Sequence, residues 1–243
     1  MVDATQLLNA PQPLLKIENL HSWYGESHIL HGVNLEIFQG ETVTLLGRNG
    51  AGKTTTLRSI MGVIRKRTGK MEFQNTDLLK LPQHRVAHEG IGYVPEERGI
   101  FSSLSVDENL MLPPELAKNA TTIDEIYQFF PNLLERRNSL GTKLSGGEQQ
   151  MLAIARILRT GARFILLDEP TEGLAPVIVE RIGEIILKLK SDGYTILLVE
   201  QNFRFATKLA DRHYVMEDGR VVDHIRSDEL SKKSAALHKF LGV

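Results

Sequence analysis

The chain has 243 residues, of which 42% are hydrophobic and 24% charged, and its 29 basic and 30 acidic side chains leave a net charge of −1. This profile is typical of a soluble globular protein that buries its own core, and the balanced charge argues against a general nucleic-acid binder. The absence of cysteine excludes disulfides and thiolate metal sites, and no apolar run reaches the length of a membrane span.

The first part of the chain predicts strands around one glycine-rich loop. Residues 1–13 lack the features of a secretory signal, and we expect them to form a flexible lead-in to a domain over residues 14–243. Alternating apolar and polar residues at 15–17 and 33–37 predict half-buried antiparallel strands. The next expected elements are a buried strand at 42–46, a helix at 53–61 and a hairpin at 69–79.

The middle of the chain has a different texture. A short helix at 85–89 and a strand at 91–94 come first. Several prolines and short helical patterns then predict an inserted, mostly helical subdomain over residues 97–143, with helices at 122–130 and 133–137.

Helices and buried strands alternate in the rest of the chain, and this order predicts a mainly parallel α/β sheet with an antiparallel β layer near the N-terminus. The expected elements are a helix at 148–159 capped by Gly161, a strand at 164–167, a helix at 177–190, a strand at 195–199, a helix at 203–210, a hairpin over 214–222 and a helical tail at 227–241.

The strongest motif is a loop between the strand at 42–46 and the helix at 53–61. It comprises Gly47, Arg48, Asn49, Gly50, Ala51, Gly52, Lys53 and Thr54, followed by Thr55. The glycines let successive N–H groups converge on one anion, and the helix start adds its positive dipole end. Lys53 is expected to reach the β- and γ-phosphates of ATP, Thr54 to ligate Mg²⁺ and Thr55 to add a hydroxyl.

Two acids end the strand at 164–167. The carboxyl end of a parallel strand faces the ligand crevice, so Asp168 is expected to hold Mg²⁺ through its water shell and Glu169 to polarise an attacking water. Many strands end in acids, so this pair alone is weak evidence. It indicates a catalytic site because a phosphate loop occurs in the same chain.

A second anion-binding helix start occurs at Ser145, Gly146, Gly147 and Glu148, within Leu-Ser-Gly-Gly-Glu-Gln-Gln. A helix cap alone explains Ser145 but not the whole run. This segment resembles the signature of ATP-binding cassette (ABC) ATPases, and the resemblance extends from Leu14 to Val243. It implies a P-loop NTPase fold and a head-to-tail pair of ATPase subunits, in which these four residues act on the ATP of the partner.

The resemblance extends to other positions. Tyr24 matches the aromatic residue that stacks on adenine, with a core aromatic as the alternative, and Glu172–Pro176 match a loop that contacts the opposite subunit, with a plain turn as the alternative. Two positions depart from the family pattern. Glu96 replaces a glutamine that senses Mg²⁺ and the γ-phosphate, and Gln201 replaces a histidine. Glu96 can still ligate Mg²⁺, and Gln201 can donate a hydrogen bond but cannot carry a proton.

The segments around Glu96, Ser145, Gly173 and Gln201 together are similar to the second ATP-binding subunit of branched-chain amino acid importers. Relatives of that type also serve urea, amides and aromatic or other organic acids. The resemblance implies a second ATPase subunit, like or unlike this one, two membrane-spanning permease subunits contacted through residues 101–142, a solute-binding protein, and a peripheral place on the cytoplasmic face of the inner membrane. The alternatives are a soluble cassette acting on ribosomes or DNA, and a cassette that uses ATP as a switch.

Overall fold

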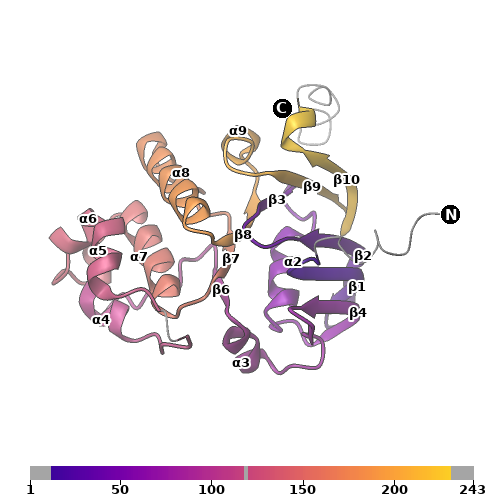
Figure 1. The fold of residues 1–243 in the computed structure, drawn as a ribbon, viewed down its shortest axis with the longest axis horizontal. Coiled ribbons are helices and arrows are strands. Elements are labelled where there is room, and N and C mark those ends of the chain that lie inside the picture. Colours follow the sequence, from indigo (N-terminus) through magenta and orange to yellow (C-terminus); the bar gives the residue numbers. More distant parts are fainter. Residues whose placement is uncertain (1–11, 118–119, 231–243) are drawn as a thin grey trace.

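The computed structural model describes residues 12–117 and 120–230. The expected lead-in at 1–13 therefore lies almost wholly outside the described residues, as does most of the tail expected to be helical at 227–241. Within the described residues, an antiparallel β layer, a central sheet and a group of helices lie side by side across the molecule (Figure 1).

The antiparallel layer contains four strands in the order β2-β1-β4-β5. Their bounds are β1 Leu15–Tyr24, β2 Ser27–Ile37, β4 Lys66–Phe73 and β5 Thr76–Asp77. The alternating apolar residues predicted to be half-buried face a core shared with the central sheet, and Phe73 stacks on Phe164 of that sheet at 5.6 Å between ring centroids. The predicted antiparallel pairing is confirmed, since Leu15 pairs with Ile37 and Ile17 with Leu35.

The central sheet has six strands in the order β10-β9-β3-β8-β7-β6. They are β3 Thr42–Leu46, β6 Ile91–Val94, β7 Phe164–Asp168, β8 Thr195–Glu200, β9 Arg212–Glu217 and β10 Arg220–Arg226. Every neighbouring pair is parallel except β9 with β10, which form the predicted hairpin. The mainly parallel sheet is thus confirmed, and its strands β3, β7 and β8 are buried along their whole length, as continuous apolar runs require.

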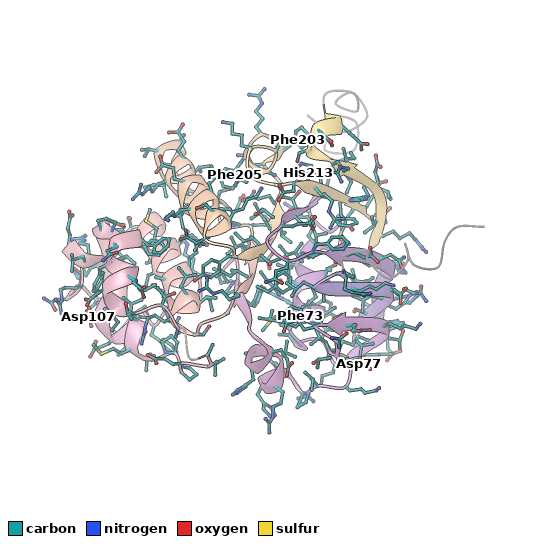
Figure 2. All side chains as sticks on the ribbon, in the orientation of Figure 1. Phe73, Asp77, Asp107, Phe203, Phe205 and His213 are labelled. Atoms are coloured by element: carbon teal, nitrogen blue, oxygen red, sulfur yellow. The ribbon has the colours of Figure 1, made fainter. Side chains whose placement is uncertain are left out.

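The helices that pack beside the sheet form one cluster on the side of β6 and β7 (Figure 1). They are α4 Val106–Met111, α5 Ile123–Phe129, α6 Pro131–Glu135, α7 Gly146–Arg159 and α8 Pro176–Ser191. Helices α2 Lys53–Ile60, α3 Gln83–Val86 and α9 Phe203–Ala206 lie elsewhere around the sheet. Phe205 of α9 lies toward α8 (Figure 2), where a Cβ added to Gly183 would come within 3.2 Å of its ring.

Several helix boundaries differ from the prediction. The helix expected from residue 148 begins at Gly146, because Ser145 accepts a hydrogen bond from the Glu148 amide and so starts the helix two residues earlier. The helix expected at 203–210 is α-helical only to Ala206. Helix α4, which was not separately predicted, also starts with a serine cap, at Ser105. Gly161 follows α7 at φ +82°, as expected of a helix-ending glycine. In the described ranges, no helix combines the length and apolar character that crossing a bilayer requires.

Candidate active site

The phosphate loop, Gly47–Thr54, connects β3 to α2 at the carboxyl end of the central sheet. Two of its glycines, Gly47 and Gly52, are required by the packing. A Cβ on Gly47 would lie 2.4 Å from the Met216 carbonyl oxygen, and Gly52 has a left-handed φ of +103° where a Cβ would lie 2.8 Å from Leu30. Larger residues would displace the loop, so the sequence fixes a tight turn that points its backbone into the site.

The N-terminus of α2 is uncapped and has the features of an anion-binding site. Its first residue follows Gly52, which provides no side-chain cap, and its first turn contains no acid. Among the described residues, the amides of Gly50, Gly52, Lys53 and Thr54 donate to no protein acceptor. Free N–H groups at the positive end of a helix dipole attract phosphate.

Lys53 is held over this loop although it is only 4% exposed. Its Nζ donates to the carbonyl oxygens of Gly47 at 3.0 Å and Arg48 at 3.2 Å, and it lies 3.2 Å from Glu169 Oε1. The ammonium group is therefore positioned by the backbone of the loop itself. This arrangement places a fixed positive charge beside the free amides.

Thr54 and Asp168 meet from two different elements. The Thr54 hydroxyl donates to Asp168 Oδ1 at 2.9 Å, and the Tyr93 hydroxyl donates to Asp168 Oδ2 at the same distance. Burial raises the pKa of Asp168, while the bonds from Thr54 and Tyr93 oppose that shift. Tyr93 was not predicted as a site residue, although its strand β6 lies beside β7, where Asp168 ends the run.

This donor set fits Mg²⁺. The ion takes oxygen ligands and is held by one or two carboxylates together with substrate phosphates and water, not by a cage of protein ligands. Thr54 supplies a hydroxyl and Asp168 a carboxylate within hydrogen-bonding distance of each other. In the part of the chain that the structure describes, no three His, Asp or Glu side chains are grouped so that they could hold a metal ion by themselves.

Glu169 occupies a strained turn directly after β7. Its φ is +45°, a left-handed value that is costly for a residue with a side chain, and it is only 9% exposed. Its amide donates to the carbonyl of Val199 in β8 at 3.0 Å, and Gln201 Nε2 donates to its Oε2 at 2.6 Å. Lys53 and Gln201 therefore each hold one carboxylate oxygen, and the side chain is fixed toward the phosphate loop.

One cavity of about 470 Å³ collects most of the predicted site residues. Its lining comprises Tyr24, Ile29, Asn49, Gly50, Gly52, Lys53, Thr54, Thr55, Glu96, Glu169, Glu172 and Gln201. Tyr24 lies at its open end with 45% of its surface exposed, so its ring is accessible for stacking. Partial burial, and then the charges of Glu169 and Asp168, raise the pKa of Glu96. The cavity has the size of a ligand pocket and is lined mainly by polar groups.

The segment Ser145–Glu148 does not line this cavity. Ser145 Oγ accepts from the Glu148 amide at 3.3 Å, and Glu148 Oε2 accepts from the Ser145 amide at 2.7 Å, which forms a complete capping box at the start of α7. Ser145 is exposed, and its side chain also hydrogen-bonds to the carboxylate of Glu148. Gly147 is needed for packing, because a Cβ there would lie 2.6 Å from Ile178 of α8.

A second group of contacts connects loops behind the cavity. Glu200, the last residue of β8, is only 3% exposed, and its carboxylate accepts from Thr171 Oγ1 at 2.8 Å and from the Asn202 amide at 3.3 Å. Burial raises the pKa of Glu200 to about 7 against the effect of these bonds. Sequence analysis did not single out Glu200, although an acid at the end of an apolar strand beside Gln201 is a usable signal.

Comparison with known proteins identifies the chain. A family model described as ABC transporter matches residues 30–172. The chain belongs to the ABC transporter family. It is a cassette ATPase of that family, as the signature segment and the phosphate loop predicted, and the expected P-loop NTPase fold is confirmed.

Curated relatives align with the cassette along nearly its whole length. The high-affinity branched-chain amino acid transport ATP-binding protein BraG of Pseudomonas aeruginosa is 40% identical, over 94% of this chain and 100% of its own. The lipopolysaccharide export system ATP-binding protein LptB of Haemophilus influenzae is 37% identical, over 90% of this chain and 95% of its own.

Solved structures agree on the fold. A dimeric, post-hydrolysis ATP-binding cassette bound to ADP and Pi matches with a TM-score of 0.74 at 29% identity, over 88% of this chain and 98% of its own. A nucleotide-free cassette from an ABC transporter matches with a TM-score of 0.82 at 24% identity, over 96% and 99%. At that identity the second likeness shows the fold alone.

Proposed function

We propose that the cavity binds MgATP and that this chain hydrolyses it with the residues that the sequence indicated. The free amides of the phosphate loop and Lys53 bind the β- and γ-phosphates, Tyr24 stacks on adenine, and Thr55 adds a hydroxyl. Thr54 and Asp168 hold Mg²⁺, and Glu96, which lines the same cavity as Thr54, shares in its shell. Bound Mg²⁺ supplies charge neutralisation of the phosphate oxygens. The observation that carries this assignment is the joint fixing of Glu169 by Lys53 and Gln201 beside the loop.

Glu169 is the base in this mechanism. As a water molecule attacks the γ-phosphorus, Glu169 accepts its proton, the bond from the γ-phosphorus to the bridging oxygen breaks, and ADP and phosphate leave. The γ-phosphate displaces the Glu169 carboxylate from Lys53, which frees Oε1 to face the water. Gln201 orients the other oxygen and donates a hydrogen bond, which compensates for the histidine that this position lacks.

Replacing Glu169 tests the assignment. Glu169→Gln should lower turnover by about 10²- to 10⁴-fold, the range expected for a general base, and leave ATP affinity unchanged. It should also accumulate an ATP-bound pair of subunits visible by gel filtration. Glu97→Gln, at an exposed glutamate outside the cavity, is the matched control. Turnover at the wild-type rate in Glu169→Gln would contradict the role of Glu169 as base.

The start of α7 supports a second subunit. The exposed Ser145 hydroxyl and the first amides of α7 lie outside their own cavity, so they are available to the γ-phosphate bound by a partner cassette. Residues 172–176 then contact that partner. The pair consists of this chain with a copy of itself or with a second cassette.

We infer that the pair energises an importer at the cytoplasmic face of the inner membrane, for branched-chain amino acids. The supporting observation is the 40% identity to BraG over the whole of that protein. Two permease subunits dock on the helical region, where Phe101, Met111 and Leu112 expose apolar side chains, and a solute-binding protein delivers the solute.

Purification of the membrane complex from the native cells tests the transport role. Permease subunits should co-purify, and leucine-loaded binding protein should stimulate ATPase activity of the reconstituted complex. Stimulation by a binding protein loaded with urea, an amide or an aromatic acid would change the assigned solute and leave the importer role standing. The similarity to LptB makes lipopolysaccharide export the main competing role. Co-purification with components of such an export system would contradict the importer role.

A further inference from the structure

Two chain segments leave the central sheet side by side at the active site. The first follows β7 and contains Glu169 and Thr171, and the second follows β8 and contains Glu200 and Gln201. Asp168 pairs with Val199 in register, and the Glu169 amide donates to the Val199 carbonyl at 3.0 Å. The sheet therefore fixes the relative position of the two segments where they begin. Farther along, their relative position depends on side-chain hydrogen bonds.

Two side-chain hydrogen bonds join these segments on opposite sides. Gln201 Nε2 donates to Glu169 Oε2 at 2.6 Å, and both residues line the nucleotide cavity. Thr171 Oγ1 donates to Glu200 Oε1 at 2.8 Å, and this pair lines a separate groove of about 730 Å³ between the segments, α8 and α9. Glu200 is not among the residues that line the nucleotide cavity.

The carboxylate of Glu200 connects three parts of the site. One oxygen takes the Thr171 hydroxyl, and the other takes the amide of Asn202 at 3.3 Å, one residue beyond Gln201. Thr171 in turn lies in the tight turn where the Glu172 amide donates to the Glu169 carbonyl at 3.1 Å. The Glu169 turn, the loop toward the partner subunit and the Gln201 segment therefore meet at one buried acid.

Packing alone does not account for an acid at this position. The rest of β8 is apolar apart from Thr195, and burying a carboxylate costs free energy that an apolar residue of similar size would not. Both Glu200 and Thr171 are nearly inaccessible, at 3% and 7% exposure. Such a pair specifies a geometry, because each partner leaves the other unsatisfied if it moves.

We propose that Glu200 is a positioning residue for ATP hydrolysis, which ties Thr171 to the Asn202 amide and thereby holds Gln201 against Glu169. The proposal rests on the hydrolytic roles proposed above for Glu169 and Gln201. A shift of the Gln201 segment would misdirect the Glu169 carboxylate while leaving the phosphate loop intact. The rate of hydrolysis should then fall without a change in nucleotide affinity.

Thr171→Val is the central test, because it keeps the shape of the side chain and removes the hydroxyl donor to Glu200, while the hydrogen bond from the Thr171 backbone to that carboxylate remains. In the paired, full-length cassette it should lower kcat by about tenfold or more, since misplacement of a catalytic group by about 1 Å costs up to 10²-fold. The Kd for ATP should stay within twofold. Thr171→Ser restores the hydroxyl and should recover most of the rate. Glu200→Gln, which keeps one acceptor, should fall between wild type and Thr171→Val.

Thr195→Val is the matched control. Thr195 begins the same strand, is 2% exposed, and its hydroxyl accepts from the Gly40 amide at the far end of the sheet. It should lose stability as Thr171→Val does and keep kcat. Equal kcat losses in both valine variants would show a merely structural effect and overturn the proposal.

A double-mutant cycle separates positioning from general weakening. If Thr171 acts through Gln201, Thr171→Val should cost no further activity in a Gln201→Ala background. Additive losses would contradict the proposal. Failure of this proposal can be told apart from failure of the proposed function. A folded Thr171→Val variant with wild-type kcat would contradict the role of Glu200, and a loss of turnover in Glu169→Gln would still support ATP hydrolysis by this site.

Discussion

Two helices of this cassette begin beside glycine-rich segments, and their starts are built in opposite ways. Helix α2 follows Gly52 with no side-chain cap, and its first amides have no protein acceptor in the described residues. Helix α7 follows Ser145 with a complete capping box, in which Ser145 and Glu148 exchange hydrogen bonds. The start of α2 leaves its amides open toward the cavity of the same chain, and the start of α7 is partly satisfied by its own cap.

The difference shows what each start can offer a nucleotide. An uncapped start with Lys53 beside it binds an anion by several N–H groups and a charge. At α7 the cap occupies the Glu148 amide, so the exposed Ser145 hydroxyl and the first two amides remain for a ligand that approaches from outside. This arrangement agrees with a secondary contact supplied by one subunit to the ATP of another. The variants below separate the two roles.

The largest effect is expected at the open start. Lys53→Ala should raise the Kd for ATP by about tenfold to 150-fold, because hydrogen bonds to a charged group contribute about 1.5–3 kcal/mol. Calorimetric titration of the purified chain with MgATP measures this change. Lys80→Ala, at a lysine whose side chain is 83% exposed, should leave affinity unaltered. Unchanged ATP affinity in Lys53→Ala would contradict the role of the phosphate loop in ATP binding.

Ser145→Ala should affect the pair and not the single chain. Affinity of the isolated chain for ATP should stay the same, and turnover of the paired cassettes should fall by about 10²-fold, as for loss of one donor to the transition state. The free energy of unfolding should also drop by about 1 kcal/mol through the lost cap. Phosphate release at saturating ATP measures the loss of turnover. Denaturant-induced unfolding, followed in parallel, measures the loss of stability.

The same capping box occurs twice more, at Ser105 with Glu108 in α4 and at Thr122 with Glu125 in α5. Ser105→Ala therefore removes an equivalent cap outside the proposed nucleotide contact. It should reproduce the loss of stability and leave the turnover of the paired cassettes unchanged. If Ser145→Ala and Ser105→Ala lowered turnover equally, the start of α7 would have no special part in catalysis.

The phosphate loop and the buried strands are the features that the sequence predicts well. Motifs in which the backbone does the work, such as Gly47–Thr54, were placed correctly because their glycine spacing determines the turn. The continuous apolar runs of β3, β7 and β8 likewise identified the buried strands, and the ends of parallel strands placed Asp168 beside Thr54.

Contacts between segments far apart in the chain were harder to predict. Tyr93 reaches Asp168 only because β6 lies next to β7, and the Thr171–Glu200 pair depends on the order of β7 and β8 in the sheet. No local pattern encodes those neighbours. The capping box at Ser145 was readable, and the predicted helix start was two residues late because the glycines that follow are weak helix formers.

The last effect concerns stability alone and arises from the packing of the capped start. Gly147 allows the first turn of α7 to lie against α8, since a Cβ would come within 2.6 Å of Ile178 Cγ2. Gly147→Ala should lower the free energy of unfolding by about 1–3 kcal/mol through overpacking, although alanine favours helix at other sites. Ile178→Ala removes the opposing methyl groups, so the double variant should recover part of the loss. Chemical denaturation of the four chains measures the coupling, and a coupling energy of zero would show that Gly147 is required for a reason other than this contact.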